Sequence, residues 1–269
     1  MQGRLIKKFH GRYQAHPMDD WEKEFKIANQ HNLGNIEFII DFYKPELNPL
    51  LNFSGNNRIK MLEKKYKVKV YSICADYFMS NPIHSMGKKK NYSLEFLKVL
   101  IVAANKLGIT NIILPCVDQS TISNNKLHQK NLIKNILSLK KLLEINKVNL
   151  LLETDLPPNK IRYILNKLNF KYFGINYDTG NSASLNYKIS EEFKVYGKSI
   201  KEIHIKDRLL NGKSIRLGKG NMDFKLFFHE LKKLNYKGKL IFQPYRDNNG
   251  KKIFFEQYDW FLKKAKEYL

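Results

Sequence analysis

Short apolar stretches and longer stretches with helical spacing follow one another regularly along the chain. The short stretches are typical of buried strands, and the longer ones carry apolar residues every three or four positions. The predicted strands are residues 3–7, 35–40, 68–74, 110–115, 148–153, 172–178, 201–206 and 238–243. The predicted helices are residues 19–32, 56–66, 93–107, 127–146, 158–168, 189–199, 223–235 and 254–267.

This alternation predicts an α/β fold with a parallel sheet, because a helix commonly connects two parallel strands. Eight strand–helix pairs in 269 residues indicate a single (β/α)8 TIM barrel that spans residues 1–269 as one domain. Active sites of such barrels lie on the face built by the loops that follow the strands. Several of those loops are long: residues 41–55, 75–92, 116–126, 179–188 and 207–222.

Composition narrows the class of protein. The chain is 43% hydrophobic and 27% charged, which is typical of a globular protein. Its apolar runs are much shorter than the roughly 18 residues of a membrane span, so we expect no membrane partner. The first residues have no apolar signal region, and two cysteines, Cys74 and Cys116, are too few for a disulfide framework. We therefore expect a cytoplasmic protein.

The chain is strongly basic, with 48 Lys and Arg against 25 Asp and Glu and a net charge of +23. Such an excess would suit a nucleic-acid-binding protein, since phosphate contacts dominate that affinity. The charges are instead scattered along predicted helices, and most of them are Lys, whereas bidentate recognition favours Arg. We interpret them mainly as a solvated surface and do not expect nucleic acid as the partner. Attraction of anionic substrates stays open.

Four polar side chains stand at the ends of four successive predicted strands. They are Glu153 in LLLETD, Asp178 in GINYDTGN, His204 in KEIHIKDR and Gln243 in LIFQPYR. Two carboxylates, an imidazole and an amide oxygen suit one divalent metal ion such as Mn²⁺, Co²⁺ or Mg²⁺, and Zn²⁺ is compatible with them. For each residue alone, a hydrogen-bonded polar strand end is the alternative. Gly-rich segments near Lys213 and Lys219 lack the spacing of phosphate or dinucleotide loops, so no nucleotide cofactor is expected.

Several segments together resemble the xylose-isomerase-like barrel superfamily, which contains sugar and sugar-phosphate isomerases and epimerases, inosose dehydratases and type IV apurinic endonucleases. The resemblance covers almost the whole chain. It implies a single divalent metal held by Glu153, Asp178 and His204 with position 243 as the fourth ligand, a small carbohydrate substrate, and compatibility with a homo-oligomer. The segments are GRYQAHPMDDWEKEF, IEFI, LLLETD, NYDTGN, EIHIKDR and LGKGNMDF.

The activity implied is that of a metal-dependent isomerase or epimerase of a sugar or sugar phosphate. A carboxylate removes the proton next to a carbonyl, and the metal stabilises the resulting enediolate. The epimerases resembled here have a second Glu where this chain has Gln243, and an amide cannot exchange that proton. Glu153 is the expected base. A second base is open among Glu37, Asp76, Asp118 and Asp155.

Other residues are expected to contact the substrate. Lys206, Arg208 and Arg246 follow the last two strands and can bind a phosphate or sugar hydroxyls, and Glu37 is a further substrate-binding candidate. The alternative for the cations is surface pairing with Asp207 or Asp247.

Three alternative functions remain open. A keto-sugar dehydratase shares the same proton abstraction. A catalytically weakened barrel that only binds a sugar is favoured by Gln243. An apurinic-site endonuclease is the least favoured, since it needs more metal ligands and most of the seven histidines miss the strand ends.

Overall fold

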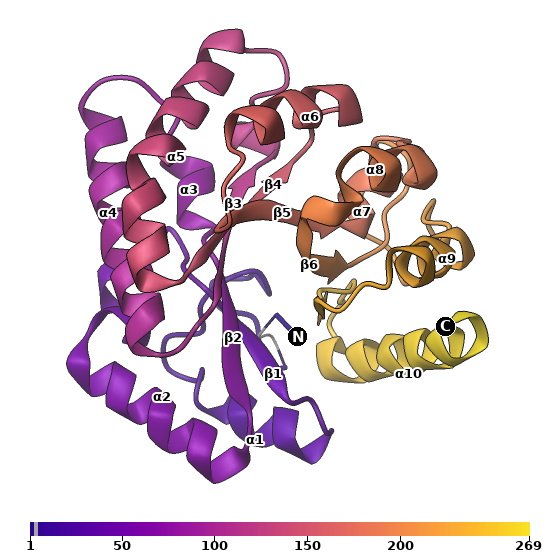
Figure 1. Ribbon diagram of the computed structural model, residues 1–269. Helices are drawn as coiled ribbons and strands as arrows, with labels where there is room; N and C mark the ends of the chain where they lie inside the picture. The colour runs from indigo at the N-terminus through magenta and orange to yellow at the C-terminus, as the bar shows by residue number, and fades with distance from the viewer. Residues whose placement is uncertain (3–4) are drawn as a thin grey trace. The chain divides into compact units, whose positions relative to one another are not determined.

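The computed structural model describes residues 1–2 and 5–269, apart from the side chains of residues 88–90. Seven strands form a parallel sheet in chain order, from β1 to β7, with helices in the connections (Figure 1). Parallel strands that follow one another in sequence need a crossover connection, which is usually a helix. The predicted α/β fold of the TIM-barrel class is therefore confirmed.

The elements agree closely with the periodicity of the sequence. The strands are β1 (Asn35–Ile39), β2 (Lys69–Cys74), β3 (Asn111–Cys116), β4 (Asn149–Thr154), β5 (Phe173–Asp178), β6 (Ile200–Ile205) and β7 (Lys239–Phe242). The longer helices are α1 (Lys23–Gln30), α2 (Phe53–Tyr66), α4 (Lys88–Lys106), α5 (Lys126–Asn146), α6 (Pro158–Lys167), α8 (Ile189–Tyr196), α9 (Phe224–Leu234) and α10 (Gly250–Tyr268). Short 3-10 turns lie at Pro45–Leu47, Pro49–Leu51, Asp118–Ser120 and Gly197–Ser199.

The chain divides into two compact units, and each is described by itself. The first consists of Met1–Thr154 with Ile164–Gly174, and the second of Asp155–Tyr163 with Ile175–Leu269.

In the first unit, strands β1 to β4 are joined by parallel pairing, with one register shift on β1 between Ile36 and Glu37. The registers align Ile39 with Cys74, Cys74 with Ile113, and Ile113 with Leu151. Helices α4 and α5 lie side by side (Figure 1). Of the apolar residues at helical spacing on α5, Leu132, Ile136, Leu139 and Leu143 are fully buried and Leu142 is half-buried.

In the second unit, β5, β6 and β7 are parallel neighbours, and α9 lies beside both α8 and α10. Its core is aromatic. Phe227 stacks on Tyr177 with 6.4 Å between ring centroids, and Phe228 contacts Phe261 at 5.2 Å. Large rings buried in this way contribute both apolar area and specific ring–ring contacts.

The predicted first strand, residues 3–7, is wrong in the part that can be assessed. Residues 3 and 4 lie outside the described residues, and residues 5–7 form no strand. The backbone N–H of Leu5 donates to the Glu24 carboxylate at 2.8 Å, so a side chain rather than a neighbouring strand satisfies it. Just before this segment, Gln2 forms a single parallel bridge with Glu37, and Glu37 N–H donates to Met1 C=O at 2.7 Å.

Two predicted loops contain short helices. The segment 75–92 includes α3 (Tyr77–Ser80) and the first turn of α4, while the segment 179–188 includes α7 (Thr179–Ser184). Helix α7 begins directly after β5 because the Asp178 side chain accepts a hydrogen bond from Asn181 N–H and caps it. In the described residues, every helix is too short or too polar to cross a membrane.

Candidate metal and substrate site

The second unit brings Asp178 and His204 together at the ends of adjacent strands. They are register partners on β5 and β6, and paired residues of parallel strands project from the same face. A carboxylate oxygen of Asp178 lies within 4.8 Å of a ring nitrogen of His204. Asp178 is 5% exposed and His204 is fully buried, so little water competes for their donor atoms.

Local hydrogen bonds fix the Asp178 end of this pair. Asn181 N–H donates to Asp178 Oδ1 at 2.8 Å, and Lys206 Nζ lies 3.9 Å from Asp178 Oδ2. The neighbouring Thr179 hydroxyl donates to Lys206 C=O at 2.6 Å and accepts from Lys206 N–H at 2.8 Å. The ends of β5 and β6 are thereby held at a fixed distance from each other.

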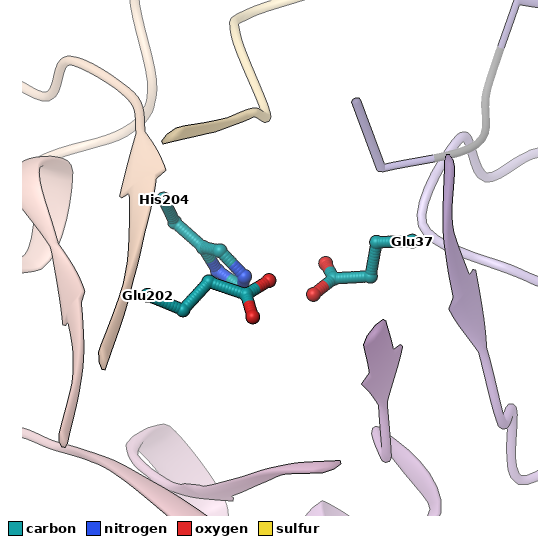
Figure 2. A group of neighbouring side chains, drawn as sticks. All are labelled: Glu37, Glu202 and His204. Carbon is teal, nitrogen blue, oxygen red and sulfur yellow. The ribbon is translucent and has the colours of Figure 1, made fainter. Parts of the chain in front are cut away.

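Glu202 is a residue of this site that the sequence analysis missed. It lies two positions before His204 on β6, is fully buried, and places a carboxylate oxygen within 4.8 Å of a His204 ring nitrogen. Figure 2 shows both side chains projecting from the same side of β6. Strand alternation was the available signal, because residues two apart share a face. Imidazole ligands of metals are commonly oriented by a carboxylate of this kind.

Gln243 follows β7 immediately and is 4% exposed. His204 pairs with Ile241 in the register, so Gln243, two residues later, lies on the same face of the sheet as His204. Its backbone N–H donates to Ile205 C=O at 3.0 Å, which continues the strand pairing to this position. An amide oxygen in this position can act as a neutral ligand but not as a base.

The three predicted substrate-binding cations differ in their surroundings. Arg208 is half-buried and donates from Nε to Gly212 C=O at 3.0 Å and from Nη1 to Asn181 Oδ1 at 2.9 Å. Arg246 is half-buried with its guanidinium carbon 5.5 Å from the centre of the Phe254 ring. The Lys206 side chain is 18% exposed and lies beside Asp178, as described above.

The first unit contains Glu153 and Glu37. Glu153 lies near the end of β4 with 8% exposure. Glu37 lies in the middle of β1, fully buried, and accepts a hydrogen bond from the Ser72 hydroxyl at 2.9 Å. Burial raises the pKa of the Cys74 thiol, and the nearby carboxylates of Asp76, Glu37 and Glu153 raise it further. The three carboxylates are therefore all close enough to the Cys74 thiol, at the end of β2, to affect its ionisation electrostatically.

The four candidates for a second base are unequal. Asp76 is buried and accepts from Cys74 Sγ at 3.2 Å, and Glu37 is buried as described. Asp118 is exposed, in a 3-10 turn with a left-handed backbone (φ 50°), and Asp155 is half-buried just after β4. Burial keeps the carboxylates of Asp76 and Glu37 away from bulk water.

The donor set fits a divalent cation. In the second unit a carboxylate and an imidazole converge, with an amide on the same face of the sheet. Oxygen-rich sets with one imidazole suit Mn²⁺, Mg²⁺, Co²⁺ or Zn²⁺.

The chain is similar to several known proteins over most of its length. A Haemophilus influenzae protein named as a candidate L-ribulose-5-phosphate 3-epimerase is 25% identical over 248 residues, 85% of each chain. The D-allulose 3-epimerase of Methylomonas sp., solved with D-allulose, superposes with a TM-score of 0.74 and 14% identity over 93% of each chain. The IOLI protein, solved with a bound zinc atom, superposes with a TM-score of 0.75 and 14% identity over 95% of each chain.

The family itself is shown by sequence. The model of the xylose isomerase-like TIM barrel family matches residues 18–264, a range that includes Glu37, Glu153, Asp178, His204 and Gln243. The chain therefore belongs to the xylose isomerase-like TIM barrel family.

Proposed function

We propose that this chain is a divalent-metal-dependent isomerase or epimerase of a sugar or sugar phosphate, with residues 1–269 acting as one barrel domain. The observation that carries the proposal is the pairing of Asp178 with His204 at the ends of β5 and β6. Relatives named as sugar 3-epimerases support it. Glu153, Asp178, His204 and Gln243 are the proposed metal ligands.

Each of these residues has a distinct proposed role in the reaction. A divalent cation held by these residues would supply Lewis-acid polarisation of the substrate carbonyl and would stabilise negative charge beside it. Glu153 removes the proton from the carbon next to the carbonyl. Gln243 cannot return it, so either Glu153 acts alone or a second carboxylate takes part. Asp76 and Glu37 are the buried candidates for that role. Lys206, Arg208 and Arg246, together with Glu37, are the proposed contacts of the substrate.

The first experiment is the metal content of protein purified without chelator, beside Glu153→Ala, Gln243→Ala and Glu144→Ala variants. Glu144 is a matched control, since it is an exposed Glu on α5. We expect about one metal ion per chain in the wild type and in Glu144→Ala, and at least about tenfold weaker metal binding in Glu153→Ala. Proton exchange of ketoses in deuterated water then identifies substrates.

Other outcomes point to other functions. No metal, even after addition of Mn²⁺ and Co²⁺, would contradict the isomerase and leave a sugar-binding barrel, which Gln243 favours. Two or three ions per chain would favour an apurinic-site endonuclease. Loss of water from a keto-sugar without racemisation at the reacting carbon would identify a dehydratase.

A further inference from the structure

We propose that Arg208 binds an anionic group of the substrate, so that this chain takes a phosphorylated or otherwise anionic sugar in preference to a neutral one. The proposal rests on the proposed function, because it names the substrate class of the same site. It depends on which groups bind the neighbouring charged side chains of Asp207 and Arg208.

The carboxylate of Asp207 is hydrogen-bonded by backbone groups. Asp207 is fully buried, and its two carboxylate oxygens accept four hydrogen bonds, all from backbone N–H groups of its own loop. The donors are Arg208 (2.9 Å), Gly218 (2.9 Å), Gly220 (2.9 Å) and Met222 (3.1 Å). The Asp207 carboxylate thus binds the backbone of its own loop. The alternative that Arg208 is a surface cation paired with Asp207 is therefore not what the structure shows.

Arg208 is held in place by neutral acceptors. Its guanidinium donates to Gly212 C=O and to the Asn181 side-chain oxygen, and no acidic side chain among residues 1–2 and 5–269 forms an ion pair with it. A half-buried cation without a counter-ion is costly, and an anion that arrives from solution relieves that cost. The planar guanidinium keeps Nη2 for a ligand and can bind phosphate or carboxylate oxygens.

One residue, Asn181, connects the Arg208 guanidinium to the proposed metal ligand Asp178 through hydrogen bonds. Asn181 accepts from Arg208 through its side chain and donates its backbone N–H to Asp178 Oδ1. A sugar whose carbonyl end lies at Asp178 and His204 would therefore present its remaining groups to Arg208. The net charge of +23 favours the approach of an anion over that of a neutral sugar.

The test measures binding of inorganic phosphate, and of L-ribulose and L-ribulose 5-phosphate as a matched pair, by calorimetry at constant ionic strength. The proteins are wild type, Arg208→Gln, Arg208→Lys and the control Arg216→Gln. Arg216 is in the same loop, but it is exposed and pairs with Glu256 at 3.3 Å. We expect phosphate affinity to fall on the order of tenfold or more in Arg208→Gln, to be partly restored in Arg208→Lys, and to be unchanged in Arg216→Gln.

Two results would overturn the proposal: equal phosphate affinity in Arg208→Gln and wild type, or equal affinity of the wild type for the neutral and the phosphorylated sugar. Metal content is measured on the same samples and is expected to be unchanged in Arg208→Gln. A protein without metal whose phosphate binding still depends on Arg208 would contradict the proposed function alone. A protein with one metal ion and no such dependence would contradict the role of Arg208 alone.

Discussion

At the scale of single residues, Asp207 explains why two sequence segments occur together. The segments IHIKDR and LGKG are separated in sequence, yet Gly218 and Gly220 both donate to the Asp207 carboxylate. Gly218 has a positive φ of 74°, and a Cβ on Gly220 would lie 2.2 Å from Asp207 Oδ1. Only glycine fits at the second position, and it is strongly favoured at the first. The pair of segments is therefore one structural feature.

Asp207→Asn tests this feature. The amide nitrogen cannot accept hydrogen bonds, so two of the four backbone N–H groups lose their partner, and we expect the free energy of unfolding to fall by about 2 kcal/mol. Urea denaturation measures it, and limited proteolysis within residues 208–222 should become faster. Asp223→Asn is the matched control, because Asp223 caps α9 through Leu226 N–H and Asn caps helices equally well. Equal stability of Asp207→Asn and wild type would contradict this role.

At the scale of elements, a buried carboxylate connects two helices and a strand of the second unit. Glu192 of α8 accepts from the hydroxyls of Tyr177 on β5 (2.9 Å), Ser182 on α7, and Tyr196 on its own helix (2.6 Å). Burial raises the pKa of Glu192, while the hydrogen bonds from Ser182, Tyr196 and Tyr177 lower it. The net pKa is raised, so desolvation outweighs the hydrogen bonds. This connection holds α7 and hence the cap at Asp178.

Replacing Glu192 with Leu should lower the free energy of unfolding by about 3 kcal/mol or more, since three hydroxyls lose their acceptor. Glu191→Leu, on the exposed face of the same helix, should change it little.

The raised pKa of Glu192 also predicts a pH dependence: its stabilising contribution is fully present below the unfolded-state pKa near 4.5 and is lost as the pH rises through the folded-state pKa. Denaturation of wild type and Glu192→Leu from pH 4 to 8 checks this, and parallel curves would contradict it.

At the scale of the whole molecule, the excess of positive charge is the dominant property. Forty-eight basic and 25 acidic residues give a net charge of +23, and the ion pairs among the described residues include several exposed ones, which contribute little. Exposed like charges repel one another over about 10 Å at 0.1 M salt. The folded state concentrates these charges, so repulsion lowers its stability relative to the unfolded chain.

We therefore expect the melting temperature to rise by about 2–5 °C between 20 and 300 mM NaCl. Calorimetry or circular dichroism measures it, and choline chloride at equal ionic strength is the control for a specific effect of sodium. A melting temperature that is constant or falls with salt would show that self-repulsion is not significant. A further rise with phosphate beyond that with chloride would be expected from binding at Arg208.

The sequence by itself determined the seven described strands, the longer helices and the residues at the ends of the strands. These follow from local periodicity, which each segment carries independently of the others. It failed at residues 5–7, where Leu5 N–H is taken by Glu24, and at 179–184, where the capping potential of Asp178 was overlooked.

Only the tertiary structure decided which side chains meet. The opposition of Asp178 and His204 depends on strand register, and a shift of one residue would turn each side chain to the other face. Three further features depend on contacts in space rather than on local pattern. They are the hydrogen bonds of Asp207 to its own loop, the neutral hydrogen-bond partners of Arg208, and the placement of Glu202 beside His204. Sequence periodicity fixes where a side chain leaves the backbone, while packing and register fix what it touches.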